Sequence, residues 1–386
     1  MFLSGMVIMA GAVINAAHIR AVDSACEDLG RVWAGSILGE YDRVLRDRYG
    51  FYGYYGNEEM VRKKLERYAD QTFKDKKYIK RSEIECSLSE YKLTDPEIFR
   101  EQLKKIMTSF WAPKPLADET GGTGEGQTDT EGYRYISAGW ILEGLPSHCI
   151  RSGISGKGGS SLLEIGYILK SFKDHVDDRD LGKTYFRNEI EYIITGKPSD
   201  EKARKWVYGE IMAERNALNL AYLYKCTAKR EAAMEAAVLI TPGPEAVITQ
   251  ALILEIWALM EARNDMELLY AGERVPLIKG DANWALGIEG AVKKAEGKSE
   301  DGELDTREER KYVEPERIEG QKYSDYLTTL LIAVPEGKRI LRIMDLIQIN
   351  LKYAYCDSFL MEDHFAGLDY SMTVNGREHT YHDEYK

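Results

Sequence analysis

The first 17 residues, Met1–Ala17 (MFLSGMVIMAGAVINAA), carry no charged side chain. A helix that spans a bilayer needs about 20 apolar residues, with a range of roughly 17 to 25. The run is therefore at the short limit for a membrane span, and the nearest charges come at Arg20 and Asp23. Because it begins at residue 1 with no basic flank, we expect the natural start to lie upstream.

Three interpretations of this run compete. A cleaved signal peptide would have a charged region before the apolar run, and none is present. A buried core helix would use Gly5, Ala10 and Gly11 for close packing. A membrane anchor is favoured because apolar residues continue at helical spacing beyond the run, between charged ones. These residues are Val32, Ile37, Leu38, Tyr41 and Leu45.

The chain is thus predicted to have three parts. Residues 1–20 form a transmembrane or pilin-like apolar helix, and 21–56 form an amphipathic helical stalk. Residues 57–386 form an extracytoplasmic α+β domain. Two polar stretches, near 117–132 and 293–310, have no apolar periodicity and are expected to be flexible insertions.

Helical periodicity and capping signals predict most of the domain to be helical. The predicted helices are Glu58–Phe73, one beginning at Asp95-Pro96, Tyr185–Thr195, Asp200–Lys225, Lys229–Ile240, Glu245–Tyr270 and Gly337–Tyr353. Within Glu245–Tyr270, the run Ala246–Met260 is apolar almost all round. We therefore expect it to be the central buried helix.

Strand signals lie early and late in the sequence. Ile84–Leu93 alternates like a strand, and Tyr353–Met361 is expected to be another. Asn375-Gly376 separates two alternating runs, which is the strongest short-range signal for a hairpin. These patterns predict an α+β fold that is mostly helical, with an N-terminal apolar helix, a helical central bundle and a small antiparallel sheet from early and C-terminal strands.

Carboxylates in the helices are the candidates for chemistry. Glu255 lies within the most apolar helix, where a buried carboxylate must be paired, hydrogen-bonded or protonated. A structural ion pair with Arg215 or Arg263 competes with a catalytic acid that uses Glu255 and Glu261. A second pair, Glu189 and Glu191, is two positions apart, so its members are not expected to share a helix face.

The stretch TGKPSDE after Glu191 resembles a phosphate loop only superficially. Gly196 fits the left-handed position after a helix, and Ser199 can cap the next one. A phosphate loop needs a glycine five residues before the Gly-Lys pair, and Glu191 occupies that place. No nucleotide is therefore expected as a partner.

Other ligand classes lack a complete pattern as well. The formal net charge of −12 opposes nucleic-acid binding. His379 and His382 would face opposite sides of a strand, which disfavours a metal site. The five cysteines are scattered without a C-x-x-C pair, and we interpret them as small buried residues. We expect no catalytic, cofactor-binding or metal-binding residues, and no cofactor.

Several segments resemble an uncharacterised bacterial envelope family. They are YDRVLRDRYGFYGYYG, NEIEYIITGKPSDEKARK, ERNALNLAYLY, IWALMEARNDMELLYAGERVPLIKG and MDLIQINLKY. The family is a domain of unknown function from Gram-positive anaerobes, whose genes tend to lie with Flp/Tad-type pilus or secretion machinery. The N-terminal region is similar to TadE-like pseudopilins. This chain departs from that pattern because it starts inside the apolar helix and shows no prepilin cleavage signal.

The resemblance implies a non-enzymatic, single-pass protein of the cell membrane, with most of the chain outside. It would be a minor or accessory component of a Tad/Flp-like pilus or secretion assembly, with the membrane and other assembly proteins as partners. One alternative is a membrane-tethered hydrolase or metal-dependent enzyme using the carboxylates of the central helices. Another is a soluble ligand-binding domain whose first helix belongs to the core.

Overall fold

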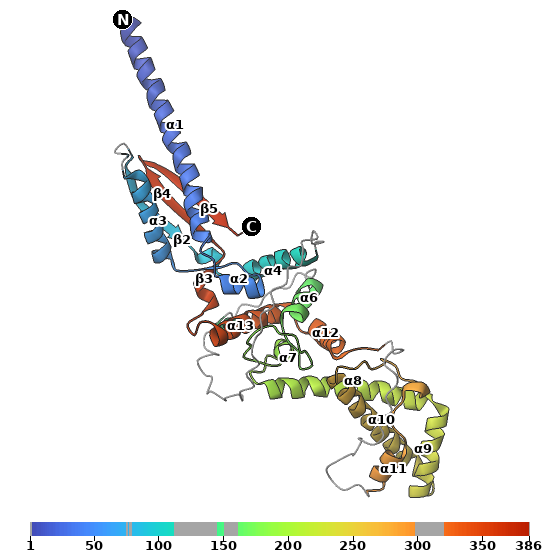
Figure 1. The fold of residues 1–386 in the computed structure, drawn as a ribbon. Coiled ribbons are helices and arrows are strands. Elements are labelled where there is room, and N and C mark those ends of the chain that lie inside the picture. The colour runs from blue at the N-terminus through green and yellow to red at the C-terminus, as the bar shows by residue number, and fades with distance from the viewer. Residues whose placement is uncertain are drawn as a thin grey trace, which may run out of the picture. The chain divides into compact units, whose positions relative to one another are not determined.

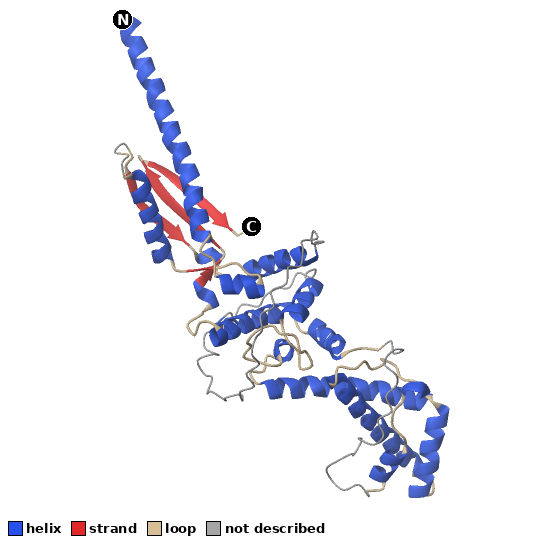
Figure 2. Cartoon of the chain, in the orientation of Figure 1, coloured by secondary structure: helices blue, strands red, loops and turns tan. Residues whose placement is uncertain are grey.

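The computed structural model describes residues 2–74, 76, 79–111, 145–149, 161–297 and 320–385. The chain forms two compact units. Unit 1 comprises Met1–Tyr167 and Glu336–Lys386, and unit 2 comprises Ile168–Pro335 (Figures 1 and 2). The fold is α+β and mostly helical, as predicted, and the named strands of the described part all lie in unit 1.

The N-terminal helix α1 runs without interruption over Phe2–Leu38. The chain then turns, and Asp42 caps the short helix α2 (Arg43–Tyr49) by accepting a hydrogen bond from the amide of Leu45 at 2.9 Å. The helical stalk predicted over residues 21–56 is therefore not one continuous helix. Asp42 caps a second helix. Apolar residues therefore continue at helical spacing through this region, although they belong to two separate helices.

The sheet of unit 1 is antiparallel, with strand order β2-β4-β5. The strands are β2 (Arg81–Ser87), β4 (Gly367–Val374) and β5 (Arg377–Glu384). β4 and β5 are joined at Asn375-Gly376, whose φ angles are 50° and 80°. Both positive values are those of a two-residue type I′ turn, so the predicted hairpin is confirmed.

Two predicted strands were placed wrongly. The strand expected over Ile84–Leu93 ends at Ser87, and a 3₁₀ turn, η1 (Ser89–Tyr91), follows it. The segment Tyr353–Met361 contains no strand, because helix α13 continues to Ala354 and a turn follows. After a second 3₁₀ turn, η6 (Met361–Asp363), the short strand β3 (His364–Phe365) pairs with β1 (Tyr54–Tyr55).

The second half of α1 and helix α3 (Glu58–Phe73) pack on one face of the sheet. Alternate residues of β4 point inward, and two tyrosine hydroxyls reach the backbone of α1. Tyr370 donates to the carbonyl of Gly30 at 2.8 Å, and Tyr381 donates to that of Cys26 at 2.9 Å. The buried cluster includes Val22, Trp33, Ala34, Ile37, Leu65, Phe73, Ile84, Leu368, Met372 and Val374.

The remaining helices of unit 1 bury further apolar and polar groups. They are α4 (Pro96–Trp111), α5 (Pro146–Cys149), the start of α6 (Ser161–Ser171) and α13 (Glu336–Ala354). The start of α4 at Pro96 agrees with the predicted cap, since Asp95 accepts the amide of Glu97 at 2.8 Å. Asn350 of the buried α13 donates to the hydroxyl of Tyr49 at 3.0 Å.

Unit 2 is a helical assembly. Its elements are α7 (Glu189–Thr195), α8 (Asp200–Lys225), α9 (Thr227–Ile240), α10 (Ala246–Tyr270), η3 (Asp281–Asn283), α11 (Glu289–Ala295) and α12 (Tyr323–Ala333). The bounds predicted for α8 are confirmed, whereas α7 starts four residues later than predicted. Of the two expected flexible insertions, 117–132 lies outside the described residues. The start of the other, 293–310, is helical, because α11 extends to Ala295, and its residues 298–310 also lie outside the described residues.

Candidate functional site

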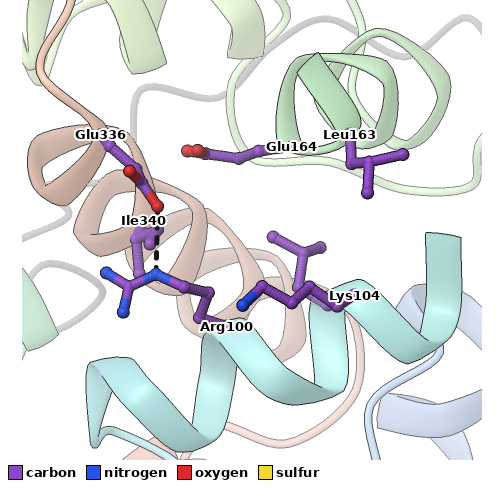
Figure 3. Close-up of a pocket in the computed structure, with 7 residues that line it drawn as sticks. Arg100, Lys104, Leu163, Glu164, Glu336 and Ile340 are labelled. Atoms are coloured by element: carbon purple, nitrogen blue, oxygen red, sulfur yellow. Dashed lines mark hydrogen bonds and ion pairs between the residues drawn. The ribbon is translucent and has the colours of Figure 1, made fainter. Parts of the chain in front are cut away.

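A small hollow in unit 1 lies between α4, α6 and α13 (Figure 3). Its lining residues are Arg100, Leu103, Lys104, Leu163, Glu164, Glu336 and Ile340. About 10 Å³ of the hollow is accessible to water, which is room for roughly one water molecule and far less than a small-molecule ligand requires. It is therefore a candidate for proton chemistry rather than for holding a sizeable ligand.

Three of the charged groups that line this hollow, Arg100, Glu164 and Glu336, are already paired. Glu164 accepts two hydrogen bonds from the guanidinium of Arg339, at 3.1 Å and 3.2 Å. Arg100 lies 3.0 Å from Glu336 and 2.6 Å from Glu97. Each buried carboxylate therefore has a fork-shaped cation beside it, which is the usual arrangement of a structural ion pair.

Burial raises the pKa of Glu164 to about 7, and the neighbouring Glu336 adds to this effect. The guanidinium of Arg339 acts in the opposite direction but does not cancel it. A carboxyl group with a pKa near 7 in a hollow is a candidate acid or base. Because Arg339 occupies both of its oxygens, we interpret Glu164 as a structural residue.

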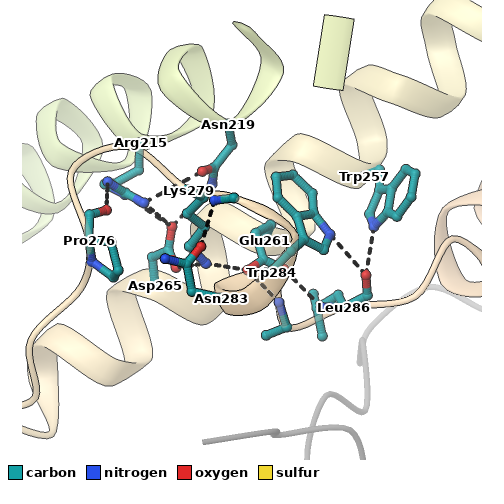
Figure 4. A network of polar contacts seen from close by, with 12 residues as sticks. Arg215, Asn219, Trp257, Glu261, Asp265, Pro276, Lys279, Asn283, Trp284 and Leu286 are labelled. Carbon is teal, nitrogen blue, oxygen red and sulfur yellow. Dashed lines mark hydrogen bonds and ion pairs between the residues drawn. The ribbon is translucent and has the colours of Figure 1, made fainter. Parts of the chain in front are cut away.

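A second buried charge network lies in unit 2 (Figure 4). The Oδ2 atom of Asp265 accepts hydrogen bonds from Arg215 at 2.8 Å and 3.0 Å, and from Asn219 at 3.1 Å. Arg215 also donates to the carbonyls of Pro276 and Leu277, both at 2.9 Å. The network therefore connects the segment after α10, at Pro276 and Leu277, to both α8 and α10.

Glu261, which lies one turn before Asp265 on α10, binds the same segment. Its carboxylate pairs with Lys279 and accepts the amides of Ala285 and Leu286, at 2.9 Å and 3.0 Å. Lys279 also lies 2.5 Å from Oδ1 of Asp265. The indole nitrogens of Trp257 and Trp284 both donate to the carbonyl of Leu286 at 2.9 Å, which leaves Glu261 sealed from solvent.

The structure separates the two carboxylates proposed for catalysis. Glu255 is exposed rather than buried, and it accepts a hydrogen bond from Asn216 at 2.8 Å. Arg215, which was expected to pair with Glu255, forms its ion pair with Asp265 instead. Because Glu261 is fully buried and Glu255 is exposed, these two carboxylates do not line a common cleft.

Sequence reasoning missed Asp265 and Lys279. A usable signal existed, because Glu261 and Asp265 are four positions apart and so lie on one face of α10. The cation that pairs with both carboxylates comes from an irregular segment after the helix, where no periodicity marks it. Buried acids at this spacing would have indicated that a cation had to be found elsewhere in the chain.

Glu189 and Glu191 are both fully buried at the start of α7. They were not expected to share a face, yet both bind the same backbone segment. Glu189 accepts the amide of Lys173 at 2.9 Å, and Glu191 accepts that of His175 at 3.0 Å. Both glutamates lie in the first turn of a short helix, where their flexible side chains can reach the same backbone segment. Gly196 adopts the left-handed conformation after α7 (φ 68°), and Ser199 caps α8, so both predictions are confirmed.

Glu191 also joins a second element, because the hydroxyl of Tyr323 on α12 donates to it at 2.8 Å. Burial raises the pKa of this carboxyl to about 7, with a smaller contribution from Asp174. The hydroxyl of Tyr323 and the amide of His175 stabilise the ionised form but do not outweigh burial. Glu191 therefore changes its protonation state near neutral pH while buried in the core of unit 2.

The histidines of the C-terminal hairpin lie on opposite faces of β5, as predicted. His379 lies 3.7 Å from Asp23, whereas His382 lies 2.8 Å from Asp369. Across the described ranges, no group of three or more histidine, cysteine or acidic side chains is arranged to hold a metal ion.

The N-terminal helix is the feature with the clearest physical character. From Met6 to Leu38 it is long and apolar enough to cross a membrane, and little of its apolar part is buried within the chain. Signal sequences satisfy the same criterion. The first large apolar residues are 63–74% exposed, namely Met6, Val7, Ile8, Met9, Val13 and Ile14.

These observations define a class: an α+β protein with one N-terminal helix able to span a membrane and with sealed interior charges. Residues 135–376 match a family of unknown function, DUF5702. This match covers more than half of the chain, and the chain belongs to that family. Neither the curated proteins nor the solved structures contain a match.

Proposed function

We propose that this chain is a non-enzymatic protein anchored in the cell membrane by α1, with both units on the outer side. In this proposal it is a minor or accessory component of a pilus or secretion assembly of the Tad/Flp type. The resemblance to an envelope family of Gram-positive anaerobes supports the choice of assembly.

One observation carries the proposal. α1 is continuous from an exposed apolar half, which includes Ile8 and Val13, to a half whose Trp33 and Ile37 are packed on the sheet. Apolar side chains in water are costly, and a bilayer or other apolar helices would remove that cost. The packed half fixes the unit to this anchor without a flexible joint.

The apolar half of α1 also suits assembly. In a membrane, helices associate through close packing, and polymerised pseudopilins hold together through their apolar N-terminal helices. The same exposed residues could therefore serve first as an anchor and then as a contact between subunits.

Fractionation of cells that produce the tagged chain tests the anchor. Charged residues at the centre of a spanning helix cost about 2.5–3.5 kcal/mol each on insertion scales. The double variant Ile8→Asp/Val13→Asp is therefore expected to leave the membrane fraction. Val32→Asp is the control, because Val32 is also exposed on α1 but lies beyond the apolar run.

Protease treatment of intact, wall-stripped cells tests the topology. Digestion of the wild-type domain from outside is expected. A soluble and protected wild-type chain would contradict the anchor, and pilus incorporation by a chain lacking residues 1–17 would contradict the assembly role.

A further inference from the structure

A lysine of unit 2 lies in a corner made by two tryptophan rings. Lys229, in the first turn of α9, places its Nζ atom 4.9 Å from the ring centroid of Trp257 and 5.0 Å from that of Trp284. The two rings stand at 83° to each other, with their centroids 5.6 Å apart. A cation over aromatic faces is the arrangement by which proteins recognise organic ammonium groups.

Both rings are held in place independently of the cation. The indole nitrogens of Trp257 and Trp284 donate to the same carbonyl, that of Leu286, at 2.9 Å (Figure 4). Trp257 also belongs to the apolar cluster of unit 2, and it is 4% exposed. Because hydrogen bonds and packing fix the two walls, a cation that binds there does not have to order them.

The corner opens to solvent at a carboxylate. Asp281, the first residue of η3, lies 3.9 Å from Nζ of Lys229, and its side chain is 78% exposed. The hydroxyl of Tyr222 donates to Asp281 at 2.7 Å and so holds this carboxylate beside the corner. A carboxylate adds a full negative charge to the attraction of the two ring faces. We name this site the indole cage: Trp257, Trp284 and Asp281.

Lys229 is a poor occupant of the indole cage. An ammonium group carries three N–H donors. Among the described residues, the Lys229 ammonium makes no hydrogen bond, because Asp281 at 3.9 Å is beyond that range. Its side chain is 17% exposed, so few of these donors reach water. A quaternary ammonium has no N–H group to satisfy, and it presents methyl groups to the rings.

The buried charge network next to the cage is neutral. Two carboxylates and two cations balance there, namely Glu261, Asp265, Lys279 and Arg215. The next cation on α9, Arg230, donates to the carbonyl of Tyr224 at 3.4 Å. Asp281, within the described part of the chain, has its ion pair with Lys229. When Lys229 leaves, this carboxylate can face an incoming cation.

We propose that the indole cage binds a quaternary ammonium group and that Lys229 fills the cage until such a group displaces it. A lysine side chain is a flexible four-carbon stem, so it can turn toward solvent while α9 stays in place. The group recognised is a trimethylammonium head, carried by a small soluble compound or by a lipid. The site lies in unit 2 and does not depend on the proposed membrane anchor.

The test measures binding of choline to the full chain in phosphatidylglycerol nanodiscs, which contain no quaternary ammonium, by saturation-transfer NMR titration. Two matched probes isolate the chemistry. Ethanolamine has a primary ammonium in place of the trimethylammonium head, and 3,3-dimethylbutan-1-ol has the same shape as choline without its charge. Choline is expected to bind about fivefold more tightly than either probe.

Variants of the cage test which groups are responsible. Lys229→Ala removes the competing occupant and should tighten choline binding about tenfold. Asp281→Asn and Trp284→Phe should each weaken it about three- to fivefold. Lys205→Ala is the control and should change nothing, because Lys205 pairs with Glu201 on α8, about 25 Å along the helix from Tyr222.

Choline should also raise the unfolding temperature of Lys229→Ala, because a ligand of the folded state stabilises it. Thermal unfolding verifies that each variant is folded. Asp281→Asn, an exposed change, keeps the test decisive if Trp284→Phe does not fold.

Vesicles distinguish the two sources of the ammonium group. Displacement of choline by phosphatidylcholine vesicles, and not by phosphatidylglycerol vesicles, would assign the cage to a lipid headgroup. Displacement by neither would assign it to a small soluble compound.

Two results would overturn the proposal. One is binding of choline to Lys229→Ala that is no tighter than binding of 3,3-dimethylbutan-1-ol. The other is choline binding that none of the folded cage variants weakens. Either result would leave Lys229 as a structural contact between α9 and the two tryptophans.

Discussion

Glu164 and Glu191 are buried carboxyl groups whose pKa values burial raises to about 7. They differ in what compensates them. Glu164 faces the guanidinium of Arg339, whereas Glu191 accepts only neutral donors from Tyr323 and His175. The ionised carboxylate of Glu191 is therefore less stabilised by its neighbours than that of Glu164.

The stability of the chain should fall as the pH rises from about 4.5 to 7. In this window the unfolded chain has lost the Glu191 proton, while the folded chain still binds it. Glu191→Gln removes this contribution and should make unfolding free energy less dependent on pH, by about 1–3 kcal/mol between pH 5 and 8. Chemical denaturation at both pH values measures it. An unchanged dependence would show that Glu191 titrates normally.

The buried pair of Arg215 and Asp265 should be among the most sensitive positions of unit 2. Asp265→Asn leaves the guanidinium without its counter-charge, and breaking a buried pair in this way costs about 3–5 kcal/mol. Glu255→Gln, an exposed change on the same helix, should cost less than about 0.5 kcal/mol. Urea unfolding compares the two variants, and similar losses would contradict the assigned difference in burial.

Among the elements, those defined by local rules were predictable. The Asn375-Gly376 turn and the start of α8 at Ser199 follow from backbone preference and capping, which act within a few residues. The exposed face of α10 and the partner of Asp265 were not predictable. They depend on which segments distant in sequence cover a helix, and apolar periodicity does not contain that information.

The close contact between α1 and β5 requires a residue without a side chain at position 30, which is Gly30. A Cβ atom at Gly30 would overlap the ring of Tyr381, whereas one at Gly35 meets no atom within 4 Å. Gly30→Ala should therefore destabilise the chain by about 1–3 kcal/mol. Gly35→Ala should stabilise it by about 0.5–1 kcal/mol through helix propensity. Thermal unfolding of both variants tests this, and a stabilising Gly30→Ala would show that α1 lies further from the sheet.

At the scale of the whole molecule, unit 2 is a single stretch of chain, and unit 1 is built from the segments before and after it. Each unit has its own apolar cluster: one formed by α1, α3 and the sheet, the other by α8, α9, α10 and α11. Separate cores allow separate unfolding.

Calorimetry of the full chain should show two unfolding transitions. Because each core is local to its unit, Gly30→Ala should lower the temperature of one transition and Asp265→Asn that of the other. A single transition shifted by both variants would mean that the units unfold together.

The nesting of the units also fixes an order of events during synthesis. β4, the central strand of the sheet, and β5, which contacts α1, leave the ribosome after all of unit 2, whereas α1 leaves before it. The packed half of α1 can meet α3 early, but it must wait until unit 2 has been synthesised before β4 and β5 exist. A premature stop codon before Gly367 would spare unit 2 and leave the N-terminal helix without its sheet.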